Sequence, residues 1–329
     1  MQLWDIYNEN IPDFVTELCS TTALRRLRAV GMNCGCEYTS LPPFRGIGSY
    51  SRYDHSVGAA LIVLHFTGDP VQTCAALFHD IATPVFAHVV DFMRGDYLTQ
   101  ESTETGTEEM ILGSGEICRI LKRYDIPVSG TLDYHRYPVA DNDSPRLSAD
   151  RLEYTLGNSV NYGFADRDTV RRLYSAICVG TNGDGEPELS FSDRDAALEF
   201  SFLSLKCARV YVSDADRYAM QILSELLRDA VRDGAISPQD LSGTEPELIS
   251  KLTLCEKYAL RWREYCALSR IVRGSGDEAG EGWRRIRAKK RCIDPLVAGE
   301  GRVSALFPEY ADALNTFRAE TQDYPITGI

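Results

Sequence analysis

Apolar residues recur along most of the chain at three- and four-residue spacing, which is the period of an amphipathic α-helix. Strand-like alternation is scarce, so the pattern predicts an all-α fold. One helix is expected over residues 12–30 and a second from near His55. Gly68 then breaks the pattern, and Asp69 and Pro70 are typical of the cap and the first turn of a third helix.

Thr83 and Pro84 repeat this cap-and-proline signature, which predicts a short helix from Pro84 to Arg94 with Thr83 as its N-cap. Two longer helices are expected over residues 193–210 and 213–233. Runs of polar, acidic or turn-forming residues predict three linkers or surface loops. These are residues 99–109, 179–193 and 274–282.

The predicted chain has two parts. Residues 1–235 are expected to form a helical domain, and residues 236–329 a smaller, mostly helical C-terminal appendage. The appendage contains "WRRIRAKKRCIDPLV", the one strongly basic patch of the sequence. We expect a subunit contact of a homo-oligomer or an effector site at this basic tail.

Composition limits the classes of function. With 329 residues, 44% apolar and 25% charged, the chain can bury a sizeable core. Its net charge of −13 argues against a nucleic-acid partner, because phosphate backbones are bound through basic surfaces. The sequence shows neither a basic stretch leading into an apolar one nor an apolar run of about 18 residues. We therefore expect a cytoplasmic protein without a membrane partner.

The ten cysteines are scattered, and no C-x-x-C pair indicates a zinc ribbon or a redox dithiol. Cys34 and Cys36 form the one close pair. They could hold a metal ion, but no second pair of thiols accompanies them. We favour a turn built around the intervening glycine.

His79 and Asp80 stand side by side in an otherwise apolar run. Burying an ionised carboxylate costs several kcal/mol unless a cation compensates it. His55 begins one expected helix and His79 ends the next, so the two meet if these helices pack antiparallel. A divalent metal ion bound by imidazole and carboxylate groups is one way to compensate Asp80, with Asp150 as a further ligand. Arg52 is an alternative partner, and spacing alone leaves both open.

Three segments together resemble a known signature: "SRYDHSVGAA", "AALFHDIATPVFAH" and "SADRLEYTLGN". In this order they are similar to the HD-domain superfamily of metal-dependent phosphohydrolases, over residues 20–235. The resemblance implies a helical bundle in which four side chains hold one divalent metal ion. These ligands are His55, His79, Asp80 and Asp150. The ligand types suit Mn, Fe, Co, Ni or Zn, with Mg also open.

Within the superfamily the chain is most similar to the deoxynucleoside triphosphate triphosphohydrolases. A nucleotide substrate is therefore expected, and Arg52 and Arg151 are candidates to neutralise its phosphates. The resemblance adds Tyr154 to the phosphate or sugar pocket, and Asn158 could reach a sugar hydroxyl. The alternatives are a phosphatase of nucleoside monophosphates or other small phosphate esters, and a non-catalytic module that holds its metal and binds a nucleotide or a protein.

The chain departs from the family at Thr83, where many HD phosphohydrolases have a catalytic His or Glu. His88 and Asp91 are predicted to replace it. They are spaced i, i+3, so Asp91 can orient the imidazole and raise its pKa toward the range that general acid catalysis needs. Some bacterial triphosphohydrolases resemble the chain in this pair as well.

Two histidines remain. His65 is expected to be an ordinary core residue. His135, in "LDYHRYP", is either a substrate contact or a hydrogen-bonding loop residue. HD oxygenases hold a second iron with two more histidines, and His88 lies too close to Asp80 to serve as one of them. The sequence therefore predicts one metal ion and no oxygenase.

Overall fold

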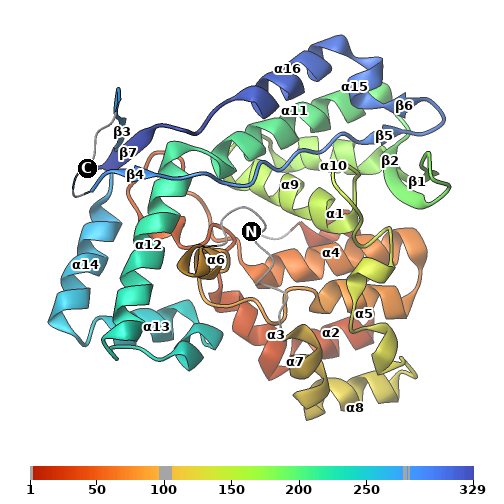
Figure 1. Ribbon diagram of the computed structural model, residues 1–329. Coiled ribbons are helices and arrows are strands. Elements are labelled where there is room, and N and C mark those ends of the chain that lie inside the picture. The colour runs from red at the N-terminus through yellow and green to blue at the C-terminus, as the bar shows by residue number, and fades with distance from the viewer. Residues whose placement is uncertain (1–2, 96–105, 277–279, 281) are drawn as a thin grey trace.

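The computed structural model describes residues 3–95, 106–276, 280 and 282–329. Most of the described chain is helical, but it also contains two small sheets, which lie on opposite sides of the molecule in Figure 1. One sheet has the strand order β1-β2-β5-β6 and the other the order β3-β7-β4. The all-α prediction is therefore corrected to a helix-rich fold with two peripheral sheets.

The α-helices are α1 Trp4–Tyr7, α2 Asp13–Cys19, α3 Thr22–Arg26, α4 Arg52–Thr67, α5 Pro70–Phe78, α6 Val89–Arg94, α7 Thr107–Gly113, α8 Gly115–Arg123, α9 Ala149–Asn161, α10 Arg167–Ser175, α11 Arg194–Tyr211, α12 Asp214–Arg232, α13 Glu245–Leu252, α14 Glu256–Ala267, α15 Val303–Leu306 and α16 Pro308–Ala319. The strands are β1 Ile177–Thr181, β2 Pro187–Phe191, β3 Ile271–Arg273, β4 Arg284–Arg285, β5 Leu296–Val297, β6 Gly301–Arg302 and β7 Pro325–Gly328.

Helices α4 and α5 form the antiparallel pair that the sequence predicts. Ser51 and Asp54 make a capping box at the start of α4, and each side chain bonds to the backbone N–H of the other. Gly68 ends α4 in the left-handed region, with φ 64°. Asp69 then accepts hydrogen bonds from the backbone of the first turn of α5, where Pro70 stands. The tight connection brings the start of α4 next to the end of α5.

Helix α9 packs against α4, and a glycine on each helix leaves room for a side chain of the site. A Cβ atom on Gly58 of α4 would lie 2.6 Å from the side chain of Glu153. A Cβ atom on Gly157 of α9 would lie 2.4 Å from the hydroxyl of Tyr50. These two positions therefore let Glu153 lie buried between the helices.

Several predicted elements differ in detail. The helix expected over residues 12–30 is divided into α2, α3 and a 3₁₀ turn, Leu27–Ala29. The helix expected from Pro84 begins only at Val89, because Phe86 and Ala87 have φ values of 60° and 45° that a right-handed helix excludes. The loop expected over residues 179–193 contains most of the β1–β2 hairpin.

The other two predicted linkers lie partly outside the described residues. Positions 99–105 of the first and positions 277–279 and 281 of the second are not described. Helix α7 begins at Thr107, so the end of the first expected linker is helical.

The core consists of two main clusters of buried apolar side chains. One lies around α4, α5, α9 and α11, and the other around α12 and α14. The C-terminal segment contributes to both: Ile293 and Val297 pack in the first cluster, and Ile286 and Ile326 in the second. Strand β5 also pairs in parallel with β2. Among the described helices, none combines the length and the apolar character needed to cross a bilayer.

Candidate metal centre

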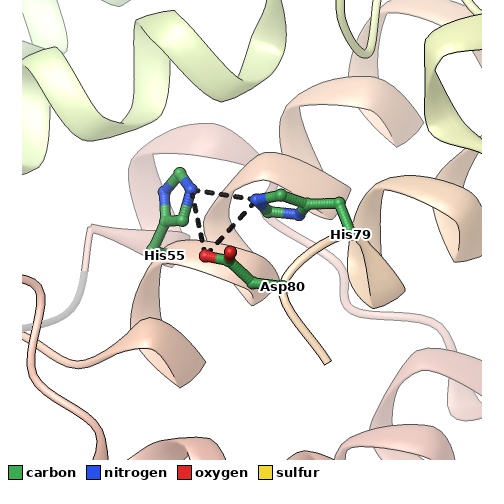
Figure 2. A group of neighbouring side chains, drawn as sticks. All are labelled: His55, His79 and Asp80. Atoms are coloured by element: carbon green, nitrogen blue, oxygen red, sulfur yellow. Dashed lines mark hydrogen bonds and ion pairs between the residues drawn. The ribbon is translucent and has the colours of Figure 1, made fainter. Parts of the chain in front are cut away.

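Four side chains from three helical elements converge on one point. His55 lies in the first turn of α4, His79 and Asp80 directly follow α5, and Asp150 lies in the first turn of α9. Figure 2 shows the first three pointing toward one another. The Nε2 atoms of His55 and His79 are 3.1 Å apart. Asp150 Oδ1 lies 3.0 Å and 3.6 Å from these nitrogens, and Asp80 Oδ2 lies 3.9 Å and 3.5 Å from them.

The outer nitrogen of each imidazole has an acceptor of its own. His55 Nδ1 lies 2.6 Å from Glu153 Oε2, and His79 Nδ1 lies 2.7 Å from the carbonyl oxygen of Ala76. Both contacts place the Nδ1 proton outward and leave the Nε2 lone pair facing the cluster. Two lone pairs 3.1 Å apart repel each other, so a positive charge at this point, either a proton on one ring or a bound cation, stabilises the arrangement.

The electrostatics of the cluster also favour a positive charge there. Burial alone would lower the pKa of His55, but hydrogen bonds to Asp150 and Glu153 raise this pKa to about 10. Burial would raise the pKa of Asp80, yet the charge of Arg52 holds it well below its usual range. Two imidazole nitrogens and two carboxylate oxygens around a site that attracts positive charge fit a divalent transition metal ion.

Glu153 is a part of the site that the sequence-based prediction does not include. Its side chain is 3% exposed, and Tyr50 and Tyr7 donate hydrogen bonds to its two oxygens. Burial raises the pKa of Glu153, while the bond to His55 opposes that effect. The available signal was its position three residues after Asp150, which puts both carboxylates on one face of α9.

Arg52 and Thr83 both bind the carboxylate of Asp80. Arg52 donates to Oδ2 at 2.9 Å, and the Thr83 hydroxyl donates to Oδ1 at 2.7 Å. The expected role of Thr83 as an N-cap is wrong, because α6 begins six residues later at Val89. Arg52, the predicted alternative partner of Asp80, therefore does pair with this carboxylate.

A cavity of about 970 Å³ opens onto the cluster. It is large enough for a nucleotide, since ligand pockets range from roughly 300 to 1,000 Å³. The structure brings ten of the eleven predicted site residues to its wall, and Asp91 is the exception. These ten are Arg52, His55, His79, Asp80, His88, His135, Asp150, Arg151, Tyr154 and Asn158.

The predicted substrate-binding residues differ in how firmly they are held. Arg151 donates to the side chain of Asn142 at 2.8 Å and lies 3.2 Å from Asp141. Burial raises the pKa of Tyr154 to about 12, so its hydroxyl stays a hydrogen-bond donor. Asn158 donates to Tyr211 at 2.8 Å, while its Oδ1 atom is buried and has no partner among the described residues.

His135 forms a loop contact at the rim of the cavity. Its side chain is 53% exposed, and Nδ1 lies 2.8 Å from Asp141 Oδ2. The predicted loop hydrogen bond is therefore present. A role for His135 in substrate binding stays a prediction.

His88 and Asp91 form the predicted pair, with Nδ1 2.9 Å from Oδ2, although α6 starts only after His88. Asp91 raises the pKa of His88, as expected, but the net pKa does not reach the range that general acid catalysis needs. Burial, and then the charges of Arg291 and Arg52, outweigh Asp91 and lower this pKa to about 4. Arg291 Nη2 lies 3.2 Å from His88 Nε2. The basic tail that contains Arg291 is evident in the sequence, but its link to the site is not.

Comparisons with known proteins give two relatives, and no family model matches the chain. The uncharacterized protein YdhJ of Bacillus subtilis (strain 168) is 28% identical over 206 residues, 61% of each chain. The metal-dependent phosphohydrolase cns2 of Cordyceps militaris is 24% identical over 216 residues, 64% of this chain and 57% of that protein. The chain thus matches about 60% of the length of these relatives.

Two solved structures share the fold across nearly the whole chain. A hypothetical protein from Aquifex aeolicus superposes with a TM-score of 0.63 at 16% sequence identity. The match covers 97% of this chain and 93% of the Aquifex chain. A phosphohydrolase from Bacteroides thetaiotaomicron VPI-5482 superposes with a TM-score of 0.62 at 14% sequence identity. This match covers 97% of this chain and 96% of the Bacteroides chain. At these identities the likeness shows the fold alone.

Proposed function

We propose that this chain is a metal-dependent phosphohydrolase of the HD type that acts on a nucleotide. The expected substrate is a (deoxy)nucleoside triphosphate, and the expected products are the nucleoside and tripolyphosphate. One observation carries the proposal: the Nε2 atoms of His55 and His79 face each other at 3.1 Å with Asp80 and Asp150 beside them. The relative named a metal-dependent phosphohydrolase and the structural neighbour named a phosphohydrolase support the same class.

His55, His79, Asp80 and Asp150 are the residues that would hold the metal ion. When bound, such an ion polarises a phosphoryl oxygen and activates the attacking water. Glu153 and the Ala76 carbonyl orient the two imidazoles, so the ligand nitrogens are in position before the ion arrives.

His88 is the proposed general acid for the leaving oxygen. In the free protein, Nδ1–H donates to Asp91 and Nε2 accepts from Arg291, so the ring is neutral. Burial contributes most to the low pKa of His88, and the charges of Arg291 and Arg52 add to it. A polyphosphate neutralises these two cations and so removes their part of the lowering. His88 Nε2 then takes up a proton from solvent water and passes it to the leaving oxygen.

Cationic side chains on the cavity wall are candidate partners for a polyphosphate. Five of them line the cavity among the described residues, together with six carboxylates, of which Asp80 and Asp150 are proposed metal ligands. The five cations are Arg52, Arg146, Arg151, Lys289 and Arg291. Charge spread over a triphosphate needs several such groups, while a single phosphate group needs fewer.

The test uses protein purified without chelator. Elemental analysis gives the bound metal, and a panel of nucleoside tri- and monophosphates is then incubated with the loaded protein. Release of tripolyphosphate from triphosphates supports the proposal. Orthophosphate from monophosphates alone replaces it with a monophosphatase, and bound metal without turnover of any nucleotide replaces it with a non-catalytic module.

A further inference from the structure

The basic C-terminal segment runs along the wall of the cavity. Figure 1 shows the chain between β4 and β5 crossing from the side of α12 and α14 to the four-stranded sheet. Its side chains alternate, as in any extended stretch. Lys289 and Arg291 line the cavity, while the Lys290 side chain between them lies at the C-terminal end of α16.

Three hydrogen-bonded contacts fix this segment on the N-terminal side of Arg291. The buried guanidinium of Arg217 donates to the carbonyl of Ile286, and Ala288 N–H donates to Gln322 Oε1 at 2.7 Å. The ammonium of Lys290 donates to the carbonyls that end α16, including that of Phe317 at 2.7 Å. A cation at a helix C-terminus meets both the unsatisfied carbonyls and the negative end of the helix dipole.

The segment is also fixed on the C-terminal side of Arg291. Ser144 donates to the carbonyl of Cys292 at 2.9 Å, and Asp294 N–H donates to the carbonyl of Pro145 at 2.8 Å. Tyr310 donates to the carbonyl of Ile293, whose side chain is buried. Arg291 therefore projects into the cavity from a backbone that is held on both sides.

We propose that residues 286–292 form a strap that completes the active site, and that Arg291 is a phosphate-binding residue held on His88 until a polyphosphate arrives. The inference rests on the proposed function and deepens it. Before binding, Arg291 donates to His88 Nε2 at 3.2 Å, which keeps that nitrogen an acceptor. A phosphate oxygen is a stronger acceptor than an imidazole nitrogen and matches the forked guanidinium.

Transfer of Arg291 to phosphate has two consequences at once. It neutralises charge on the phosphate chain, and it frees His88 Nε2 to carry a proton. The strap thus links polyphosphate binding to the state of the general acid. Because Arg291 lines the cavity that the metal ligands also line, we expect it to contribute more to binding a chain of phosphates than to binding a single phosphate.

The probe is inorganic tripolyphosphate, titrated calorimetrically into the metal-loaded full-length protein, with orthophosphate as the comparison. We expect Arg291→Gln to weaken tripolyphosphate binding about 10- to 100-fold, the size of one or two charge-assisted hydrogen bonds. Orthophosphate binding should change less than about threefold. Arg291→Lys keeps the charge but loses the fork, so part of the affinity should return.

The matched control is Arg287→Gln, which removes the same charge from the same strap. The Arg287 side chain is 62% exposed, and it lies 3.5 Å from the carboxylate of Asp323. We expect tripolyphosphate to bind this variant as it binds the wild type. Thermal melting and metal content, measured for each variant, separate a local effect from misfolding.

The outcomes separate the strap from the proposed function. Equal tripolyphosphate affinity in wild type and Arg291→Gln overturns the strap while the phosphohydrolase stands. Equal losses for Arg287→Gln and Arg291→Gln overturn it too, since they indicate general charge attraction. A wild type that loads metal but neither binds tripolyphosphate nor hydrolyses any nucleotide overturns both.

Discussion

Glu153 Oε2 lies 2.6 Å from Nδ1 of His55, and this contact joins α9 to α4 beneath the ligand cluster. A carboxylate in this position fixes the ring orientation of His55 and makes Nε2 a better electron donor. Because Glu153 is itself buried between two helices, the geometry of the metal centre depends on how closely those helices pack.

Glu153→Gln should lower metal affinity about 10- to 100-fold with little change in fold, because the amide keeps the shape but not the charge that polarises His55. Competition with a graded chelator series measures the affinity. Glu264→Gln, on the exposed side of α14, is the control and should leave it unchanged. Unchanged affinity in Glu153→Gln would show that Glu153 only fills space.

Gly58→Ala tests the close packing of α4 on α9. The added Cβ atom would stand 2.6 Å from Cγ and Oε1 of Glu153, so either the helix or the carboxylate must move. Overpacking of this kind costs about 1 to 3 kcal/mol. We expect a lower free energy of unfolding in urea together with weaker metal binding. Gly113→Ala, where nothing lies within 4 Å, should be close to neutral.

Chelation should destabilise the wild-type protein. A ligand that binds only the folded state adds about 2.7 kcal/mol when its concentration is about 100 times its dissociation constant. Removing the ion also leaves the two carboxylates and the two imidazoles of the site close together without the cation that offsets the repulsion between like groups. We expect a lower melting temperature in EDTA, restored by excess Mn²⁺ or Zn²⁺. In Asp150→Asn, which lacks one ligand, EDTA should shift the melting temperature less.

The buried imidazole of His88 should make stability depend on pH. Burial, Arg291 and Arg52 lower the pKa of His88 from 6.5 to about 4. Between these values the unfolded chain binds the proton and the folded chain does not, so stability is present above pH 6.5 and lost as pH falls toward 4. The full effect is at most about 3 kcal/mol. Urea unfolding of wild type and His88→Gln from about pH 4 to pH 7 should show a smaller loss in the variant.

The parts of the site that lie near local sequence signals could be predicted. Gly68, Asp69 and Pro70 mark a tight connection, and a tight connection between two helices makes them antiparallel, which is why His55 and His79 could be expected to meet. His88 and Asp91, spaced i, i+3, likewise contact each other, although the helix begins later than predicted.

Other features depend on contacts that no local pattern encodes. Phe86 adopts a left-handed backbone conformation that its residue type disfavours, and it lies buried with its ring 6.0 Å from that of Tyr38. This packing overrides the Pro84 helix signal. Arg291 reaches His88 across 203 positions of sequence. Strand β2 pairs with β5, which follows the segment that contains Arg291. Because β2 is short and follows a turn rich in glycine, the local pattern predicts a loop there.

His88→Gln gives the sharpest distinction between catalysis and mere metal holding. The amide can still accept a hydrogen bond from Arg291, but it cannot deliver a proton to the leaving oxygen. General acid catalysis contributes about 10²- to 10⁴-fold, so kcat should fall by at least about 100-fold while metal content and tripolyphosphate affinity stay near the wild-type values. A triphosphate with a better leaving group at the scissile oxygen should recover part of the lost rate, because it needs the proton less. If His88→Gln hydrolyses nucleotides at the wild-type rate, the proton comes from another group and the dyad is structural.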